Sequence, residues 1–94
     1  MKLCKTDRRF KLRGFGFDCY LEFDDLREYV HYQKHCRDIF GEQFFLLGKR
    51  VYQEGKYHFE LYRYRNGVRV RRIYLKDEKH LTLLMMTMPS YVES

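Results

Sequence analysis

The chain has 94 residues, of which 45% are hydrophobic and 34% are charged, and its formal net charge is +6. This length supports one domain with one core, and the composition excludes a disordered chain. The most apolar stretch, residues 81–88, is too short to cross a bilayer, and residues 1–5 begin with charge, so we expect a cytoplasmic protein with no targeting segment and no membrane partner.

Residues 1–13 contain six basic side chains and the single acid Asp7. We interpret this segment as a basic arm that leads into the first strand of a single domain covering residues 1–94. From Phe15 to Phe23 apolar side chains occupy alternate positions, with Asp18 and Glu22 between them. This alternation predicts a strand with one buried face.

A helix is predicted after this strand. Asp24 is a good N-cap, Asp25 adds negative charge to the first turn, and Gly41 supplies a stop. A stripe at helical spacing lies between these signals. It consists of Leu26, Tyr29, Gln33, Cys36 and Phe40, and it is widened by Tyr32 and Ile39.

Two short apolar segments, residues 44–47 and 51–52, precede a longer hairpin over residues 57–75. We predict that the hairpin turns through a three-residue loop, residues 65–67, with Gly67 in the left-handed region. This register makes the outer hairpin amphipathic. It pairs Tyr64 with Val68 and Tyr62 with Val70 on one face, and it places Arg63, Arg65, Arg69 and Arg71 on the other.

The segment 80–88 follows a predicted turn at residues 76–79 and fits either a strand or a helix. Its apolar side chains have helical spacing, yet a short loop after a hairpin favours a further strand. We favour the strand. The predicted fold class is therefore α+β, an antiparallel sheet of about five strands in the order β-α-β-β-β-β with one helix on one face.

Residues 13–20 resemble the RNP1 octamer of the RNA recognition motif, in which a basic residue and two aromatic residues face RNA. The resemblance implies that Phe15 and Phe17 stack on bases. The alternation favours the opposite orientation, because exposing these rings would bury the carboxylates of Asp18 and Glu22. We therefore expect both rings in the core.

Basic charge is concentrated in two parts of the chain, residues 1–13 and residues 49–72. Arginine outnumbers lysine by eleven to eight, and arginine forms bidentate contacts with phosphate. A row of arginines on a β-ribbon with tyrosines on its other face is suited to a nucleic-acid backbone. The candidate binding residues are Arg63, Arg65, Arg69, Arg71, Arg72, Lys49, Arg50, Tyr62, Tyr64, Arg8 and Arg9.

Catalytic, metal and cofactor sites are not predicted. The three cysteines, an odd number without CxxC spacing, read as free thiols. His31 and His35 have the spacing of a metal pair, but no third ligand accompanies them, and we expect both to be solvated. No glycine-rich phosphate loop is present, so we expect no cofactor.

The sequence thus predicts a small, basic, non-enzymatic protein that binds RNA or DNA, alone or within a nucleoprotein, through the arginine-rich hairpin. The alternative is a protein-binding inhibitor or adaptor, for example a phage- or virus-encoded antagonist of a host nucleoprotein such as an anti-CRISPR protein. Tyrosine and arginine are typical of protein interfaces, so a homodimer belongs to this alternative. A small metal-independent ribonuclease is the second alternative, because the chain resembles RelE-type toxins in size, charge and antiparallel sheet.

Overall fold

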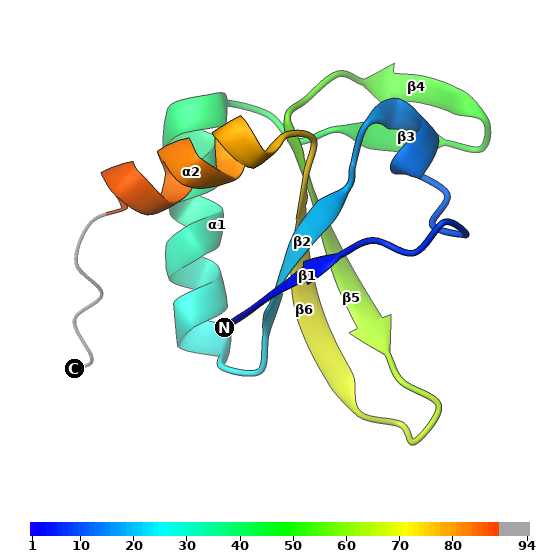
Figure 1. Cartoon of the computed structure of the whole chain (residues 1–94), viewed down its shortest axis with the longest axis horizontal. Coiled ribbons are helices and arrows are strands. Elements are labelled where there is room, and N and C mark those ends of the chain that lie inside the picture. Colours follow the sequence, from blue (N-terminus) through cyan, green and yellow to red (C-terminus); the bar gives the residue numbers. More distant parts are fainter. Residues whose placement is uncertain (89–94) are drawn as a thin grey trace.

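An antiparallel sheet and two helices form the body of the protein in a computed structural model that describes residues 1–88 (Figure 1). The four-stranded sheet has the order β1-β2-β6-β5, and β3 and β4 form a separate two-stranded sheet. The predicted α+β class is confirmed, with six strands in place of about five. In chain order the elements are β1 (Lys2–Lys5), the 3₁₀ turn η1 (Arg13–Phe15), β2 (Cys19–Phe23), α1 (Leu26–Phe40), β3 (Phe45–Leu47), β4 (Arg50–Gln53), β5 (Tyr57–Arg63), β6 (Arg69–Leu75) and α2 (Glu78–Thr87).

The basic N-terminal segment is part of the folded body. β1 pairs with β2, and residues between these two strands form turns and η1. Residues 13–20, which resemble RNP1, do not form one strand. Gly16 takes a left-handed φ of 97° and ends η1, and β2 begins only at Cys19. Phe17 is fully buried as predicted, whereas the prediction that Phe15 is buried is wrong, since this ring is 37% exposed.

α1 begins one residue later than predicted. Asp25 is the N-cap, and its Oδ1 accepts a hydrogen bond from the backbone N–H of Arg27 at 2.9 Å. Gly41 follows the last helical residue, as the sequence indicated. The buried face of the helix packs against β2, β5 and β6 through a core cluster that includes Tyr29, Tyr32 and Cys36.

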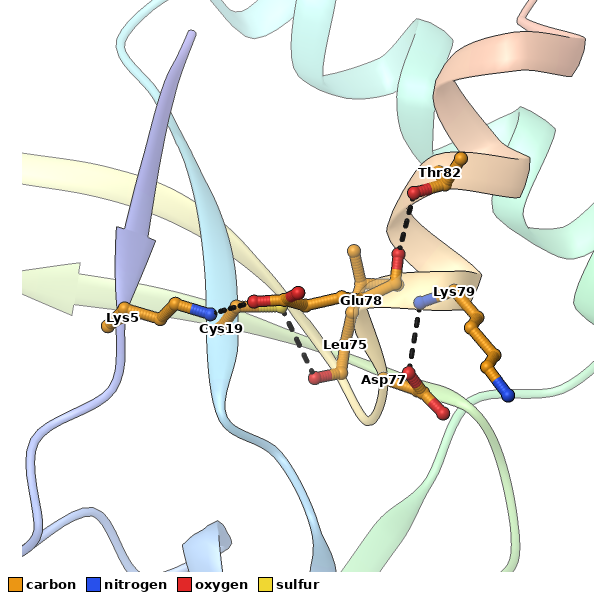
Figure 2. A network of polar contacts seen from close by, with 7 residues as sticks. All are labelled: Lys5, Cys19, Leu75, Asp77, Glu78, Lys79 and Thr82. Atoms are coloured by element: carbon orange, nitrogen blue, oxygen red, sulfur yellow. Dashed lines mark hydrogen bonds and ion pairs between the residues drawn. The ribbon is translucent and has the colours of Figure 1, made fainter.

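The C-terminal element is a helix, so the preference for a strand over residues 80–88 was wrong. β6 already lies between β2 and β5, and a further strand next to β6 has no free edge to join. Asp77 caps α2 by accepting from the Lys79 N–H, and the Glu78 side chain pairs with Lys5 of β1 (Figure 2). Leu84 of α2 is buried in the same core cluster as the apolar face of α1.

The contact between α1 and α2 also corrects the expectation that His35 is solvated. His35 is buried, and its Nε2 lies 2.8 Å from the Thr87 hydroxyl. Nearby, the Tyr32 hydroxyl donates to the Met85 sulfur at 3.8 Å. Within residues 1–88, no helix is long and apolar enough to span a membrane.

The face of the sheet opposite the helices is covered by a second cluster. Leu12, Phe17, Phe44 and Tyr74 are buried there, and the Phe10 ring stacks on Tyr74 with centroids 4.2 Å apart. The cover comes from the segment between β1 and β2 and from the residues around β3. The hydrophobic core therefore lies on both sides of the four-stranded sheet, but it leaves the outer end of the β5–β6 hairpin uncovered.

Candidate nucleic-acid interface

The outer end of the β5–β6 hairpin has the predicted register. Tyr62 is the cross-strand partner of Val70, and the Tyr64 N–H donates to the Val68 carbonyl at 2.9 Å. Gly67 has a φ of 85°, the left-handed conformation that a three-residue loop requires. The sequence therefore correctly predicted both the loop and the separation of the two hairpin faces.

One face of this hairpin end carries Arg63, Arg69 and Arg71, and Arg65 is exposed in the adjoining loop. Arg63 and Arg69 are direct cross-strand partners. Arg63, Arg65 and Arg69 are exposed, and in the described part of the chain none of these three side chains makes a hydrogen bond or an ion pair. Arg71 is half-buried, with its guanidinium carbon 5.9 Å from the centre of the Tyr29 ring.

This arrangement places like charges together without neutralising them. Cross-strand side chains lie roughly 4.5–5.5 Å apart at Cβ, and like charges directly opposite each other destabilise a hairpin. Positions two residues apart on a strand, such as Arg69 and Arg71, are separated by about 6.5–7 Å. An anion that spans several of these positions would relieve the repulsion. We call these four residues the arginine face.

Arg72, also predicted as a binding residue, does not belong to the arginine face. Its side chain points to the opposite side of the sheet, where it pairs with Glu22 at 3.2 Å and donates to the Tyr74 hydroxyl at 3.1 Å. Burial disfavours the charged guanidinium, but hydrogen bonds from Arg72 to Tyr74 and Tyr64 outweigh it and raise the pKa of Arg72. Arg72 is therefore a charged, internally paired residue.

Tyr62 and Tyr64, also predicted as binding residues, pack around Arg72. The guanidinium carbon of Arg72 lies 3.7 Å from the Tyr62 ring centre and 4.2 Å from that of Tyr20. The Tyr64 hydroxyl donates to the Glu22 carboxylate. Burial raises the pKa of Tyr20 to about 12. Both predicted tyrosines are only half-exposed, and the Tyr64 hydroxyl and the Tyr62 ring already contact this internal cluster.

The remaining predicted residues lie elsewhere. Arg8 and Arg9 are exposed in the segment after β1, and Lys49 and Arg50 are exposed at the turn of the β3–β4 hairpin. These two regions lie close together, because Phe10 and Leu12 from the first and Phe44 and Leu46 from the second belong to one apolar cluster. The turn of the β5–β6 hairpin projects from a different end of the molecule (Figure 1). The eleven candidate residues therefore do not form one continuous surface.

A hollow that the sequence did not predict lies at the start of β5, with a volume of about 490 Å³. It is lined by Phe40, Lys56, Lys76, His80 and three other residues. Burial, and then the charge of Lys56, lower the pKa of His80, and its Nδ1 is buried without a hydrogen-bond partner within the described residues. His80 lies in the first turn of α2, where the sequence favoured a strand, and so the hollow was not expected.

Residues 1–88 contain no group of three or more His, Cys, Asp or Glu side chains placed to hold a metal ion. Cys19 and Cys36 are buried in the core, and burial raises the pKa of these thiols to about 11 and about 12. Neither thiol is suited to nucleophilic chemistry at neutral pH.

No protein-family model matches the chain, and no curated protein or solved structure is significantly similar to it.

Proposed function

We propose that this protein binds nucleic acid, without catalysis, by contacting the phosphate backbone through Arg63, Arg65, Arg69 and Arg71. The observation that supports this function is the arginine face itself, in which four arginines gather at one hairpin end and form no ion pair with any carboxylate of residues 1–88. Guanidinium groups make bidentate hydrogen bonds with phosphate, and such charge-assisted contacts are the strong class of hydrogen bond.

Arg72 on the same strand supports the argument by contrast. There the fold supplies Glu22 and a tyrosine hydroxyl to a buried arginine. On the arginine face no described carboxylate plays that role, and the exposed charges of Arg63, Arg65 and Arg69 remain available to solvent or to a ligand. A phosphate backbone supplies the missing negative charge at regular intervals, which a single acidic side chain of a partner protein does not.

The proposal predicts a defined dependence on salt. If the arginine face neutralises four phosphates, the logarithm of affinity falls with the logarithm of salt concentration with a slope of about −3.6 on duplex DNA and about −2.8 on a single strand. Fluorescence anisotropy with labelled single- and double-stranded RNA and DNA at several salt concentrations measures this slope.

The decisive variant is Arg65→Ala/Arg69→Ala, which removes two exposed charges from the arginine face. The expected result is a slope on duplex DNA that is smaller by about 1.8. The matched control is Lys34→Ala/Lys79→Ala, which removes the same charge from exposed positions on α1 and α2. The proposal fails if the wild-type protein does not bind any of the four probes at low salt, or if both double variants lose affinity equally.

A protein partner is the second candidate, and it has a specific observation in its favour. The outer side of α2 exposes Leu83 and Met86, the latter to 80%, beside a hollow of about 460 Å³. Exposed apolar groups of this kind are common at protein interfaces. Capture of a partner that persists in high salt and after nuclease treatment, and that is lost in Met86→Asp, supports this candidate. Capture that disappears with nuclease supports the nucleic-acid proposal instead.

A further inference from the structure

The β3–β4 hairpin carries two exposed aromatic rings side by side. Phe45 on β3 and Tyr52 on β4 meet edge to face, with ring centres 5.9 Å apart and planes inclined at 78°. Tyr52 is 71% exposed and Phe45 is 42% exposed. The edge-to-face contact holds the two rings relative to each other but leaves a broad face of Tyr52 in solvent. Such a face is suited to stacking against a flat ligand.

A shallow hollow of about 290 Å³ adjoins this ring pair. Besides the two rings, it is lined by the polar side chains Glu42, Gln43 and Gln53. Gln53 Nε2 donates to the backbone carbonyl of Gln43 at 2.6 Å. The side-chain oxygen Oε1 of Gln43 accepts from the backbone N–H of Phe59 at 3.1 Å. These bonds fix both amides. In the part of the chain that the structure describes, the Glu42 carboxylate and Gln53 Oε1 retain free acceptor capacity.

The turn of the same hairpin adds positive charge. Gly48 has a left-handed φ of 62°, and the two residues that follow it, Lys49 and Arg50, are both exposed. No carboxylate within residues 1–88 pairs with either of them. The hairpin and the segment just before it thus combine an aromatic stacking face, a set of hydrogen-bond acceptors and a basic turn.

We propose that this hairpin is a second nucleic-acid site, at which one unpaired base of a single strand stacks on Tyr52 and presents its edge to Glu42 and Gln53, while Lys49 and Arg50 contact the adjoining phosphates. The inference rests on the proposed function and makes it more specific, since the bases of a duplex are already stacked and paired and cannot enter the hollow. An aliphatic side chain of a protein partner fits less well, because it would desolvate the carboxylate and the amides without bonding to them.

The acceptors also predict which bases are preferred. A carboxylate accepts hydrogen bonds from an exocyclic amino group, as carboxylates do from cytosine N4. Cytosine carries such a group, whereas uracil does not. The site should therefore bind oligo-cytidine more tightly than oligo-uridine, and Glu42→Gln should reduce this difference.

The central test is Tyr52→Ala, measured by anisotropy with labelled oligo-cytidine RNA, its single-stranded DNA counterpart and a duplex of the same length. Loss of one stacked base is expected to weaken single-strand binding by about 5- to 150-fold and to leave duplex binding unchanged. Tyr52→Phe should retain the affinity of the wild-type protein, because it keeps the ring. The matched control is Leu47→Ala, an apolar position of the same hairpin that is 62% exposed but does not line the hollow.

The outcomes separate this inference from the proposed function. If the wild-type protein binds single strands and Tyr52→Ala binds them equally well, or if Leu47→Ala weakens binding as much as Tyr52→Ala does, the stacking site is refuted. The arginine face stands in that case, provided that Arg65→Ala/Arg69→Ala still reduces the salt slope. If the wild-type protein binds neither single strands nor duplex, both proposals fail together.

Discussion

Replacing Arg72 with Met is expected to destabilise the fold strongly, although Arg72 lies on the same strand as two residues of the arginine face. Its guanidinium is 3.2 Å from the Glu22 carboxylate, and the two side chains are only 10% and 12% exposed. Methionine preserves much of the apolar volume between the rings of Tyr20 and Tyr62. It cannot pair with a carboxylate, so the variant leaves Glu22 charged and nearly buried.

The size of the loss follows from this geometry. Removing one partner of a buried ion pair costs about 3–5 kcal/mol, since the remaining charge stays desolvated. Typical domains have about 0.05–0.15 kcal/mol of stability per residue, or about 5–14 kcal/mol for a chain of 94 residues. The variant therefore loses a large share of the free energy of unfolding. For a denaturant slope of about 1.5 kcal/mol per M urea, the unfolding midpoint falls by about 2–3 M.

Urea unfolding followed by far-ultraviolet circular dichroism measures this change. The matched control is Arg69→Met, on the same strand but exposed and unpaired, for which a change within about 0.5 kcal/mol is expected. The double variant Arg72→Met/Glu22→Gln should recover most of the lost stability. Glutamine removes the orphaned charge and still accepts the hydrogen bond from Tyr64.

Equal midpoints for Arg72→Met and Arg69→Met would refute the assignment of Arg72 as a buried, paired residue. A double variant that is as unstable as Arg72→Met alone would show that packing against the tyrosine rings, rather than the orphaned carboxylate, accounts for the loss.

Three further predictions test other parts of the fold. Gly55→Ala should destabilise by about 1–3 kcal/mol in urea unfolding, because its Cβ would lie 2.3 Å from the Phe44 backbone nitrogen. Asp25→Ala should cost about 0.5–2 kcal/mol as a lost N-cap while Asp24→Ala costs little, and equal losses would contradict the observed cap. Burial and then Lys56 lower the pKa of His80, so the unfolded chain binds its proton more readily. Stability should hold above pH 6.5, the ordinary pKa of histidine, and decline below it. The unfolding midpoint of His80→Gln should fall less over this range, and an unchanged pH profile would contradict the shift.

Sequence patterns alone predicted the elements whose signals are local. Alternating side chains identified Cys19, Leu21 and Phe23 as the buried positions of β2, although they did not reveal that a 3₁₀ turn ending at Gly16 precedes the strand. Phe17 is buried too, but in the cluster on the opposite face of the sheet. Helical spacing and Gly41 located α1 to within one residue at its start. In the β5–β6 hairpin, the face on which arginines gather depends only on strand alternation and on the left-handed conformation of Gly67. These features depend on neighbours a few residues apart, and so they can be inferred from the chain itself.

The tertiary structure decided the features that depend on distant partners. Segment 80–88 had signals for both a helix and a strand, and the central position of β6 between two other strands favoured the helix. Arg72 had the charge of a binding residue, but Glu22, fifty residues earlier in the chain, made it an internal one. The hollow beside Tyr52 likewise needs residues from both sides of the β3–β4 turn. Burial and ion pairing are set by long-range contacts, and local periodicity carries no information about which distant side chain supplies them.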